Sequence, residues 1–467
     1  MKLAIVGGGP SAFYVASRLL SRMPDAGLRV HIFDRLWAPH GLVRYGVAPD
    51  HPEVKNCTNK FDQVAADPRF HFYGNVNVGT PKPAAMEDAV QLGLRDLQTH
   101  YSHLVFATGC ALPALHSALA ESAWCMSALS FVHWYTQHPS APPPPALNTL
   151  SHVSLIGNGN VALDVARILL TPPSVLERYD VPQPVLDVLA RSTVRHVQII
   201  ARRGPLHVAF TAKELRELTN LPDASMQPID PSLLAIPSGT TPTRQQTRIL
   251  QLLGQGSRNT FGTTPKTWTL DFFKSPTGLE PPPPGESLPR LLLTHTAVNN
   301  DGRAIPTTPA PPLPTSLVIP SLGFRSEPAA PFFDPTTGHL RTKAGRVLGA
   351  DGRPIRGVYA SGWAANGARG VLATTMMDAY AVADTVMSDA ADGAEVGVEP
   401  HPELPMNPSP SDDLPPPQVR VAAARVVTYP DWKRVDAEEV RRGELLGKER
   451  ERMRWEEAQV FLQGQPS

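Results

Sequence analysis

Cysteine is scarce in this chain, with 3 residues among 467 and no pair at C-x-x-C spacing. An iron–sulfur cluster held by protein thiolates needs about four of them, so the chain cannot supply the ligands of such a cluster by itself. Without paired cysteines we also expect neither a vicinal redox disulfide nor a secreted scaffold built on disulfide bonds. The scarcity of cysteine therefore indicates a reducing compartment.

Net charge is also lacking, because 43 Lys and Arg residues balance 43 Asp and Glu residues. No global field then favours nucleic acid or an anionic membrane, although local basic patches stay open. A membrane-spanning helix needs about 18 consecutive apolar residues, and no apolar run in the sequence approaches this length. A hydrophobic content of 42% with 18% charged residues is typical of a globular protein, and 467 residues suffice for two or three domains.

The first clear motif is a glycine turn near the N-terminus. Residues 3–6 form a short apolar run that predicts a buried strand, and residues 7–12 follow with the pattern G-x-G-x-x-A before a helical segment. Asp34 closes the next predicted strand, about where a carboxylate would accept a hydrogen bond from a ribose hydroxyl. Strand, glycine turn, helix and acid in this order predict a dinucleotide site.

A second unit of the same kind begins at residue 153. A predicted strand leads into Gly157-Asn158-Gly159-Asn160-Val161-Ala162, and the matching second strand ends at Arg202 and Arg203 rather than at an acid. A carboxylate repels a phosphate, whereas guanidinium groups bind a 2′-phosphate through paired hydrogen bonds. We therefore expect a nucleotide with a free ribose in the first unit and NADP in the second.

Other segments have less specific patterns. We expect a loop over residues 41–56, strands over 70–78 and 103–109, and helices over 244–254, 370–387 and 448–463. The chain has 51 prolines, and the clusters at 141–145, 281–284, 306–314 and 405–417 predict loops or extended connectors. The late strand–turn–helix around Trp363 and Gly370 is expected to return to the first dinucleotide site, where its helix start could face an anion.

Four stretches together resemble the adrenodoxin-reductase family of mitochondrial-type ferredoxin–NADP reductases. They are residues 6–10, residues 41–56 (Gly-Leu-Val-Arg-Tyr-Gly-Val-Ala-Pro-Asp-His-Pro-Glu-Val-Lys-Asn), residues 157–170 with 202–218, and residues 361–363 with 370–375. A weaker match runs through residues 431–440. Departures from the family pattern are mild: Asp34 stands where Glu is usual, His40 where Phe is usual, and Ser11 where a small apolar residue is usual.

The resemblance implies a fold, cofactors and site residues. The fold is α/β, with two Rossmann-like dinucleotide-binding domains of the glutathione-reductase-like flavoprotein type. Residues 1–112 and 329–467 would form the FAD domain, the latter with a C-terminal extension, and 113–328 the inserted NADP domain. Together with the glycine motifs, it predicts FAD contacts from Gly7, Gly9, Ser11, Ala12, Asp34, Leu42, Val78, Trp363, Gly370, Val371 and Leu372. It predicts NADP contacts from Gly157, Asn158, Gly159, Asn160, Val161, Arg202, Arg203, Glu214 and Gly370, and no metal site.

The activity that the resemblance implies is NADPH:ferredoxin oxidoreduction. A flavin links a two-electron hydride donor to a one-electron [2Fe–2S] acceptor, so no protein nucleophile is required. His51 and Asp164 are candidates for proton handling, because histidine titrates near neutrality and Asp164 lies early in the helix after the second glycine turn. The alternative is that His51 only caps its loop and that Asp164 only caps or forms an ion pair.

The partner implied is an acidic ferredoxin that serves monooxygenases or iron–sulfur and haem synthesis. Arg244 and Arg248, spaced by about one helical turn, are the expected docking pair, with a solvated helix face as the alternative. The resemblance implies the mitochondrial matrix, but no presequence is visible, so the cytoplasm is the alternative; peripheral membrane contact stays open. Rival functions are an NADPH diaphorase or quinone reductase and a catalytically silent flavoprotein acting as an interaction module.

Overall fold

The computed structural model describes residues 1–237, 239–391 and 404–464, which form two compact units. The first unit comprises Met1–Leu112, Thr136–Ser140 and Phe324–Ser467, and the second comprises Pro113–Tyr135 and Ala141–Gly323. The second unit is thus inserted in the chain of the first, as in the fold that the resemblance implies. The exact limits of the predicted domains stay a prediction.

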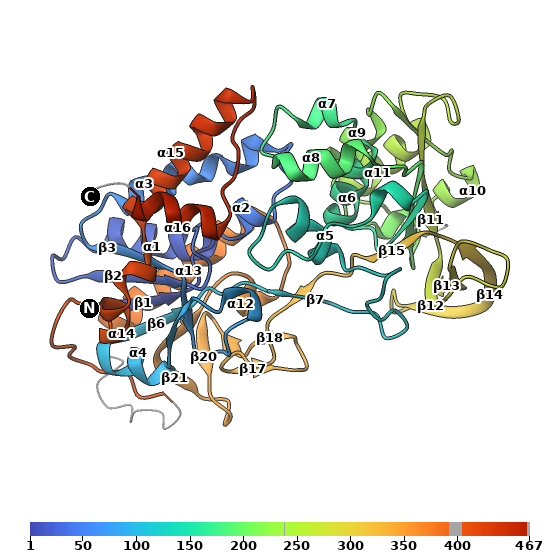
Figure 1. Ribbon diagram of the computed structural model, residues 1–467. Helices are drawn as coiled ribbons and strands as arrows, with labels where there is room; N and C mark the ends of the chain where they lie inside the picture. Colours follow the sequence, from blue (N-terminus) through green and yellow to red (C-terminus); the bar gives the residue numbers. More distant parts are fainter. Residues whose placement is uncertain (238, 392–403, 465–467) are drawn as a thin grey trace. The chain divides into compact units, whose positions relative to one another are not determined.

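The first unit contains an eight-stranded sheet in the order β19-β20-β21-β6-β1-β2-β3-β22 (Figure 1). The five strands from β21 to β3 pair in parallel, whereas the strands beyond them on both sides are antiparallel. Because β1 lies between β6 and β2, the strand order reverses at β1, and in such sheets ligands bind beyond the carboxyl ends of the strands at this point. The strands of this unit are β1 Lys2–Val6, β2 Arg29–Asp34, β3 Phe70–Gly74, β4 Val76–Val78, β5 Val90–Leu92, β6 His103–Phe106, β17 Phe333–Asp334, β18 His339–Leu340, β19 Thr342–Lys343, β20 Arg346–Leu348, β21 Pro354–Ala360 and β22 Val427–Thr428.

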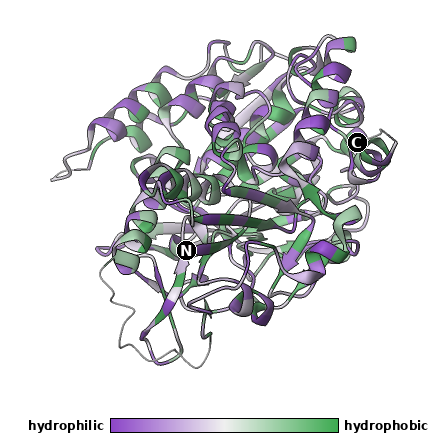
Figure 2. Ribbon diagram, turned by 90° about the vertical axis from the view of Figure 1, so that its left-hand side faces the viewer, coloured by the Kyte–Doolittle hydropathy of each residue, from purple (hydrophilic) through white to green (hydrophobic). Residues whose placement is uncertain are grey.

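Alternate residues of β1 explain why this sheet is covered on both faces. Leu3 and Ile5 belong to a core with the helices α1, α3, α13, α15 and α16, whereas Ala4 and Val6 belong to a core with β4, β5 and α4. Figure 2 views the molecule from the side of this unit and shows helices on which hydrophilic and hydrophobic stretches alternate, as expected for helices with one buried face. The helices are α1 Pro10–Arg22, α2 Leu42–Tyr45, α3 Thr58–Ala65, α4 Leu94–His100, α12 Trp363–Asn366, α13 Leu372–Ala391, α14 Pro417–Val421, α15 Tyr429–Leu445 and α16 Trp455–Gln463.

The second unit contains a five-stranded parallel sheet in the order β10-β11-β9-β8-β15 and a three-stranded antiparallel sheet in the order β12-β13-β14. Its strands are β8 His152–Ile156, β9 His196–Ala201, β10 Ala224–Met226, β11 Lys266–Phe272, β12 Lys274–Glu280, β13 Arg290–Val298, β14 Ala304–Pro314 and β15 Leu317–Pro320. Its helices are α5 Ala128–Tyr135, α6 Asn160–Leu170, α7 Pro173–Leu176, α8 Gln183–Ala190, α9 Ala212–Thr219, α10 Pro231–Leu234 and α11 Arg244–Gln255. The short strands β7 Leu112–Pro113 and β16 Phe324–Arg325 pair where the two units join along the chain.

Several expected elements differ in detail from those observed. The expected loop 41–56 contains α2 and a 3-10 helix, Pro52–Cys57, and the expected strand 70–78 is divided at Asn75, whose φ is +62°. The tract 306–314 is not a connector but part of β14, an edge strand, where prolines are tolerated because one side of the strand needs no N–H donors.

The expected helix over 448–463 is wrong in its first half, because α16 begins only at Trp455. The N–H groups of Lys448 and Glu451 donate to the carbonyls of Gly443 and Glu439 on α15, at 3.0 and 2.8 Å. These hydrogen bonds fold residues 448–451 back onto α15, and the chain enters the next helix only at Trp455.

Candidate functional site

The first glycine turn joins β1 to α1 at the point where the sheet order reverses. Gly7 has a φ of +104°, and a Cβ there would lie 2.4 Å from the carbonyl oxygen of Ala107, so no other residue fits. The space beside Gly9 is open, and α1 begins at Pro10 with no side-chain cap and no acid in its first turn. The free N–H groups and the dipole of this helix therefore suit an anion such as a pyrophosphate.

Asp34 lies at the end of β2, beside the glycine turn. Its Oδ2 accepts a hydrogen bond from the N–H of Gly8 at 2.8 Å, and its Oδ1 accepts one from the N–H of Leu36 at 3.0 Å. Burial raises the pKa of this carboxyl to about 6, against the lowering effect of those hydrogen bonds. Asp34 thus holds the glycine turn in place, and its contact with a ribose stays a prediction.

A cleft lies beside Asp34 in the first unit, with about 620 Å³ of empty space when the part open to solvent is counted. Side chains at the carboxyl ends of β1, β2, β4 and β6 form one wall, and Glu327, which pairs with Arg35 at 2.5 Å, lies on another. The predicted residues Gly7, Asp34 and Val78 line this cleft. The remaining lining residues are Val6, Phe33, Arg35, Val76, Asn77, Thr80, Phe106, Thr108, Gly109, Ala111, Glu327, Ala330, Pro331 and Leu340.

Two distant stretches of the chain meet the glycine turn. The Oγ atoms of Ser11 and Ser361 share a buried hydrogen bond of 2.7 Å, and Ala12 is fully buried in the same helix. On the other side, a Cβ on Gly41 would lie 3.0 Å from the Cα of Gly9, which places the start of α2, at Leu42, against the turn. The fold thus gathers Ser11, Ser361 and the start of α2 around one helix terminus.

Asp378 is a site residue that the sequence pattern did not reveal. Its Oδ2 accepts a hydrogen bond from the N–H of Gly362 at 2.6 Å, and its Oδ1 accepts one from Asn366 at 2.7 Å. It thereby fixes the turn that carries Trp363, whose indole N–H donates to the carbonyl of Arg369 at 3.1 Å. A single acid on a helix has no local signal, so only the fold identifies this contact.

The predicted residues Gly370, Val371 and Leu372 lie where α13 begins. Gly370 has a φ of +82°, and α13 starts at Leu372. The N–H of Val371 donates to Thr374 Oγ1 at 2.9 Å, while its side chain is 53% exposed. The contact of this turn with a flavin stays a prediction.

The second glycine turn repeats the geometry of the first inside the second unit. Gly157 has a φ of +117°, and a Cβ there would lie 2.2 Å from the carbonyl oxygen of Ser321, whereas the space beside Gly159 is open. Helix α6 follows with no side-chain cap and no acid in its first turn. Within the described chain the buried Nδ2 of Asn158 has no hydrogen-bond partner, and Asn160 Oδ1 accepts from the N–H of Thr211 at 2.8 Å. The turn therefore has free donors for a second anion.

Arg202 and Arg203 follow β9, which pairs with β8 beside this turn. The N–H of Gly157 donates to the carbonyl of Ile200 at 2.8 Å, so the arginines and the glycine turn lie at the same edge of the sheet. Arg202 is exposed and Arg203 is half-buried. Burial, with the charge of Arg202 beside it, lowers the pKa of His116. This edge of the second unit is therefore cationic, as a 2′-phosphate site requires.

Arg167 is a second residue that the sequence analysis missed, and it organises the acids near α6. Its guanidinium is 3% exposed and bonds Asp164 Oδ1 at 2.7 Å, Glu214 Oε2 at 3.0 Å and Glu217 Oε2 at 3.3 Å. Asp164 thus forms the ion pair named above as its alternative role. Its proton handling, like the NADP contact of Glu214, stays a prediction.

His51 lies in the first unit, whereas Asp164 lies in the second. Its side chain is 6% exposed, and it precedes the 3-10 helix Pro52–Cys57 without capping that helix through its ring. The ring of His51 therefore does not cap this helix. The catalytic role of His51 stays a prediction.

The raised pKa of Asp34 predicts an unusual pH dependence of stability. Folding raises this pKa from 3.8 to about 6, so the native state binds the proton more tightly than the unfolded state does. The free energy of unfolding that depends on Asp34 therefore falls as pH rises through this window. In Asp34→Asn this group no longer titrates, so the decrease disappears. The free energy of unfolding of Asp34→Asn minus that of the parent, measured by urea unfolding, should therefore increase by about 3 kcal/mol from pH 3 to pH 8. Parallel pH profiles for the two proteins would contradict the burial argument.

Comparison with known proteins identifies the family. A family model described as FAD-NAD(P)-binding matches residues 4–109. The chain is 36% identical to the mitochondrial NADPH:adrenodoxin oxidoreductase of Bos taurus, over 97% of this chain and 90% of that protein. It is 33% identical to the NADPH-ferredoxin reductase FprA of Mycobacterium tuberculosis, over 96% of each. A solved structure of Mycobacterium tuberculosis FprA in complex with NADPH superimposes with a TM-score of 0.83 at 31% identity, covering 99% of both chains. The chain belongs to the NADPH:adrenodoxin oxidoreductase family.

Proposed function

We propose that this protein is an FAD-dependent NADPH:ferredoxin oxidoreductase. The observation that carries the proposal is the contrast between its two nucleotide sites: Asp34 ends the second strand of the first, whereas Arg202 and Arg203 directly follow that of the second. An acid suits the free ribose of FAD, and a pair of guanidinium groups suits the 2′-phosphate of NADPH. Electrons then go to a [2Fe–2S] ferredoxin of the kind that supplies monooxygenases or iron–sulfur and haem synthesis.

Both cofactors fit the chemistry of the residues present. The open space beside Gly9 and Gly159 admits a pyrophosphate at each helix terminus, and each terminus has free N–H donors. When bound, the flavin accepts a hydride from NADPH and releases electrons singly. The chain itself supplies position: Asp378 holds the turn at Gly362, and Ser11 ties helix α1 to Ser361.

The eukaryotic relatives are named as mitochondrial proteins, whereas FprA is bacterial. In the described chain no helix combines the length and the apolar character needed to cross a membrane. We propose the mitochondrial matrix as the location, with the cytoplasm as the alternative. Fractionation with a protease-protection assay distinguishes them, since protease resistance that outlasts removal of the outer membrane supports the matrix.

The proposed function predicts which nucleotide reduces the flavin and which acceptor the reduced protein needs. The purified protein should be yellow and should be bleached anaerobically by NADPH but not by NADH, because only NADPH carries the 2′-phosphate. Reduction of cytochrome c should then require added ferredoxin. Ferredoxin-independent reduction of quinones alone would favour a diaphorase, and a colourless protein after reconstitution with FAD would favour a silent interaction module.

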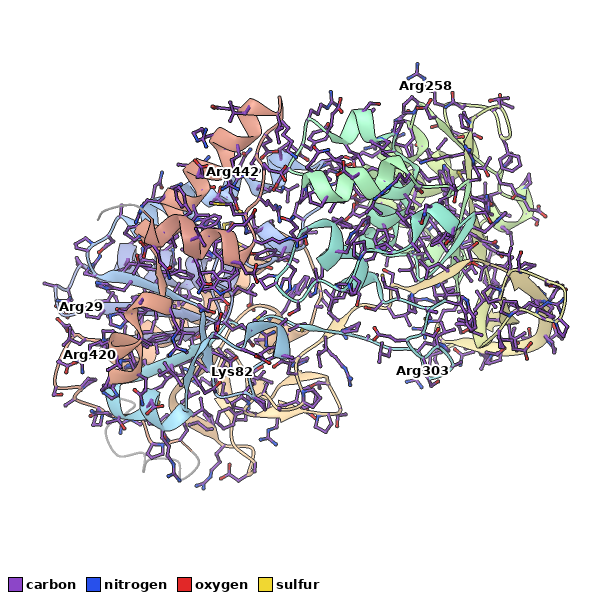
Figure 3. All side chains as sticks on the ribbon, in the orientation of Figure 1. Arg29, Lys82, Arg258, Arg303, Arg420 and Arg442 are labelled. Carbon is purple, nitrogen blue, oxygen red and sulfur yellow. The ribbon has the colours of Figure 1, made fainter. Side chains whose placement is uncertain are left out.

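Substitution of the arginine pair isolates the nucleotide preference within that experiment. Arg202→Ala with Arg203→Ala should raise the KM for NADPH about 100-fold or more, since charge-assisted hydrogen bonds contribute about 1.5–3 kcal/mol each, and should leave any residual oxidation of NADH nearly unchanged. Arg258→Ala, which removes an exposed arginine elsewhere in the second unit (Figure 3), is the matched control. Equal losses with both nucleotides would reject the assignment of the pair.

His51 is proposed to take part in proton handling beside the flavin. His51→Ala should lower the rate of ferredoxin reduction about tenfold or more while leaving the Kd for NADPH within about twofold, as expected for a group that acts in turnover rather than in binding. His71→Ala, which changes an exposed histidine of the same unit, serves as the control. An unchanged turnover number would remove His51 from the mechanism.

Arg244 and Arg248 are proposed to dock the acidic ferredoxin. Both are exposed on α11, a helix of the second unit. Arg244→Glu with Arg248→Glu should raise the apparent KM for ferredoxin several-fold at low ionic strength and should have little effect at about 0.5 M salt, where exposed charges are screened. Arg258→Glu with Arg303→Glu makes the same change of net charge at exposed positions elsewhere in this unit. If both double variants behave alike, docking does not depend on α11.

A further inference from the structure

A buried ion pair connects the segment beside the glycine turn to helix α15 near the C-terminus. Arg44 Nη1 donates to Glu439 Oε2 at 2.9 Å, and Arg44 Nη2 donates to Glu439 Oε1 at 2.7 Å. The two side chains are 5% and 0% exposed, and the guanidinium lies 4.7 Å from the ring centre of Trp432. This paired, desolvated geometry fixes both direction and distance, which a single contact would not.

The carboxylate of Glu439 also accepts hydrogen bonds from residues that follow helix α15. The N–H of Met453 donates to Glu439 Oε1 at 2.9 Å, and Arg450 Nη1 donates to Oε2 at 3.4 Å. A Cβ on Gly443 would lie 2.3 Å from the Cα of Arg450, so residues after α15 pack closely on the helix. The carboxylate therefore has a fixed position from which it can place Arg44.

The residues just before Arg44 touch the glycine turn itself. The N–H of His40 donates to the carbonyl of Gly8 at 2.8 Å, and Gly41 packs against Gly9. The backbone of His40 is left-handed, with a φ of +81°. Its ring Nε2 and Tyr429 Oη share a hydrogen bond of 3.1 Å. Helix α15 thus contacts this segment twice, through Tyr429 at its first residue and through Glu439 further along.

We propose that Glu439 is a positioning residue for the FAD site. By fixing Arg44, it holds residues 40–45 against the glycine turn, so that this segment forms a rigid wall beside the pyrophosphate rather than a mobile loop. The proposal rests on the proposed binding of FAD. It assigns to the C-terminal helix α15 a part in holding the cofactor, although no residue of α15 is expected to touch it.

Two adjacent glutamates on α15 provide a matched test. Glu438 accepts hydrogen bonds from Arg441 and Arg442 of the same helix, and within the described chain its ion pairs are with these two arginines rather than with residues 40–45 (Figure 3 labels Arg442). Glu439→Gln and Glu438→Gln each remove one charge from the same helix with no change of shape. Only Glu439→Gln removes the charge that the buried guanidinium of Arg44 faces in this ion pair.

The readouts are the Kd for FAD of the apoprotein, the visible circular dichroism of the bound flavin and the free energy of unfolding. Glu439→Gln should raise the Kd about tenfold or more and change the flavin dichroism, whereas Glu438→Gln should leave the Kd within about twofold. Arg44→Lys, which keeps the charge and loses the paired geometry, should lie between them and decides the matter if Glu439→Gln does not fold.

Three results overturn the proposal in distinguishable ways. If the parent protein binds no FAD, the proposed function itself fails. If it binds FAD and Glu439→Gln matches it in both Kd and dichroism, the positioning role fails alone. If Glu439→Gln loses stability but its bound flavin keeps the parent dichroism, the ion pair only stabilises the fold.

Discussion

The structure depends on two places where a side chain cannot exist. Gly7 and Gly157 each turn the chain out of a strand that pairs in parallel on both sides, and in each case a carbonyl oxygen of a neighbouring segment lies within 2.4 Å of where a Cβ would be. This close packing lets the following helix begin just past the carboxyl end of the strand, where its free N–H groups face outward from the sheet. Both units repeat the constraint, so each presents one anion site built from backbone alone.

What differs between the units is the charge placed beside that common geometry. Asp34 accepts hydrogen bonds from backbone N–H groups with both of its oxygens, and although burial raises its pKa to about 6, the group is mostly ionised near neutrality, so the first site carries an acid. In the second unit, Arg202 and Arg203 lie at the sheet edge. Three nearby acids instead form ion pairs with Arg167. Under the proposed function, selectivity between two similar nucleotides follows from a few charges on one repeated backbone.

Local patterns predicted the parts of this architecture that local physics determines. The strand–glycine turn–helix units, the acid at Asp34 and the arginines after β9 all follow from short-range periodicity and turn chemistry. The roles of Asp378, Arg167 and Glu439 could not be predicted, because each side chain also contacts residues outside its own helix. The predicted start of α16 was wrong for the same reason: long-range hydrogen bonds from Lys448 and Glu451 fold this part of the chain back onto α15.

The long-range contacts also explain why the FAD-type unit needs its last hundred residues. The glycine turn supplies anion donors but no walls, since Gly9 has open space beside it. One wall comes from Ser361 and the turn that Asp378 holds, and the other from residues 40–45, which α15 holds through Tyr429 and Glu439. Both walls are fixed by residues from beyond the inserted unit. A chain that stopped before residue 361 would retain the fingerprint without the enclosure that turns an anion site into a cofactor site.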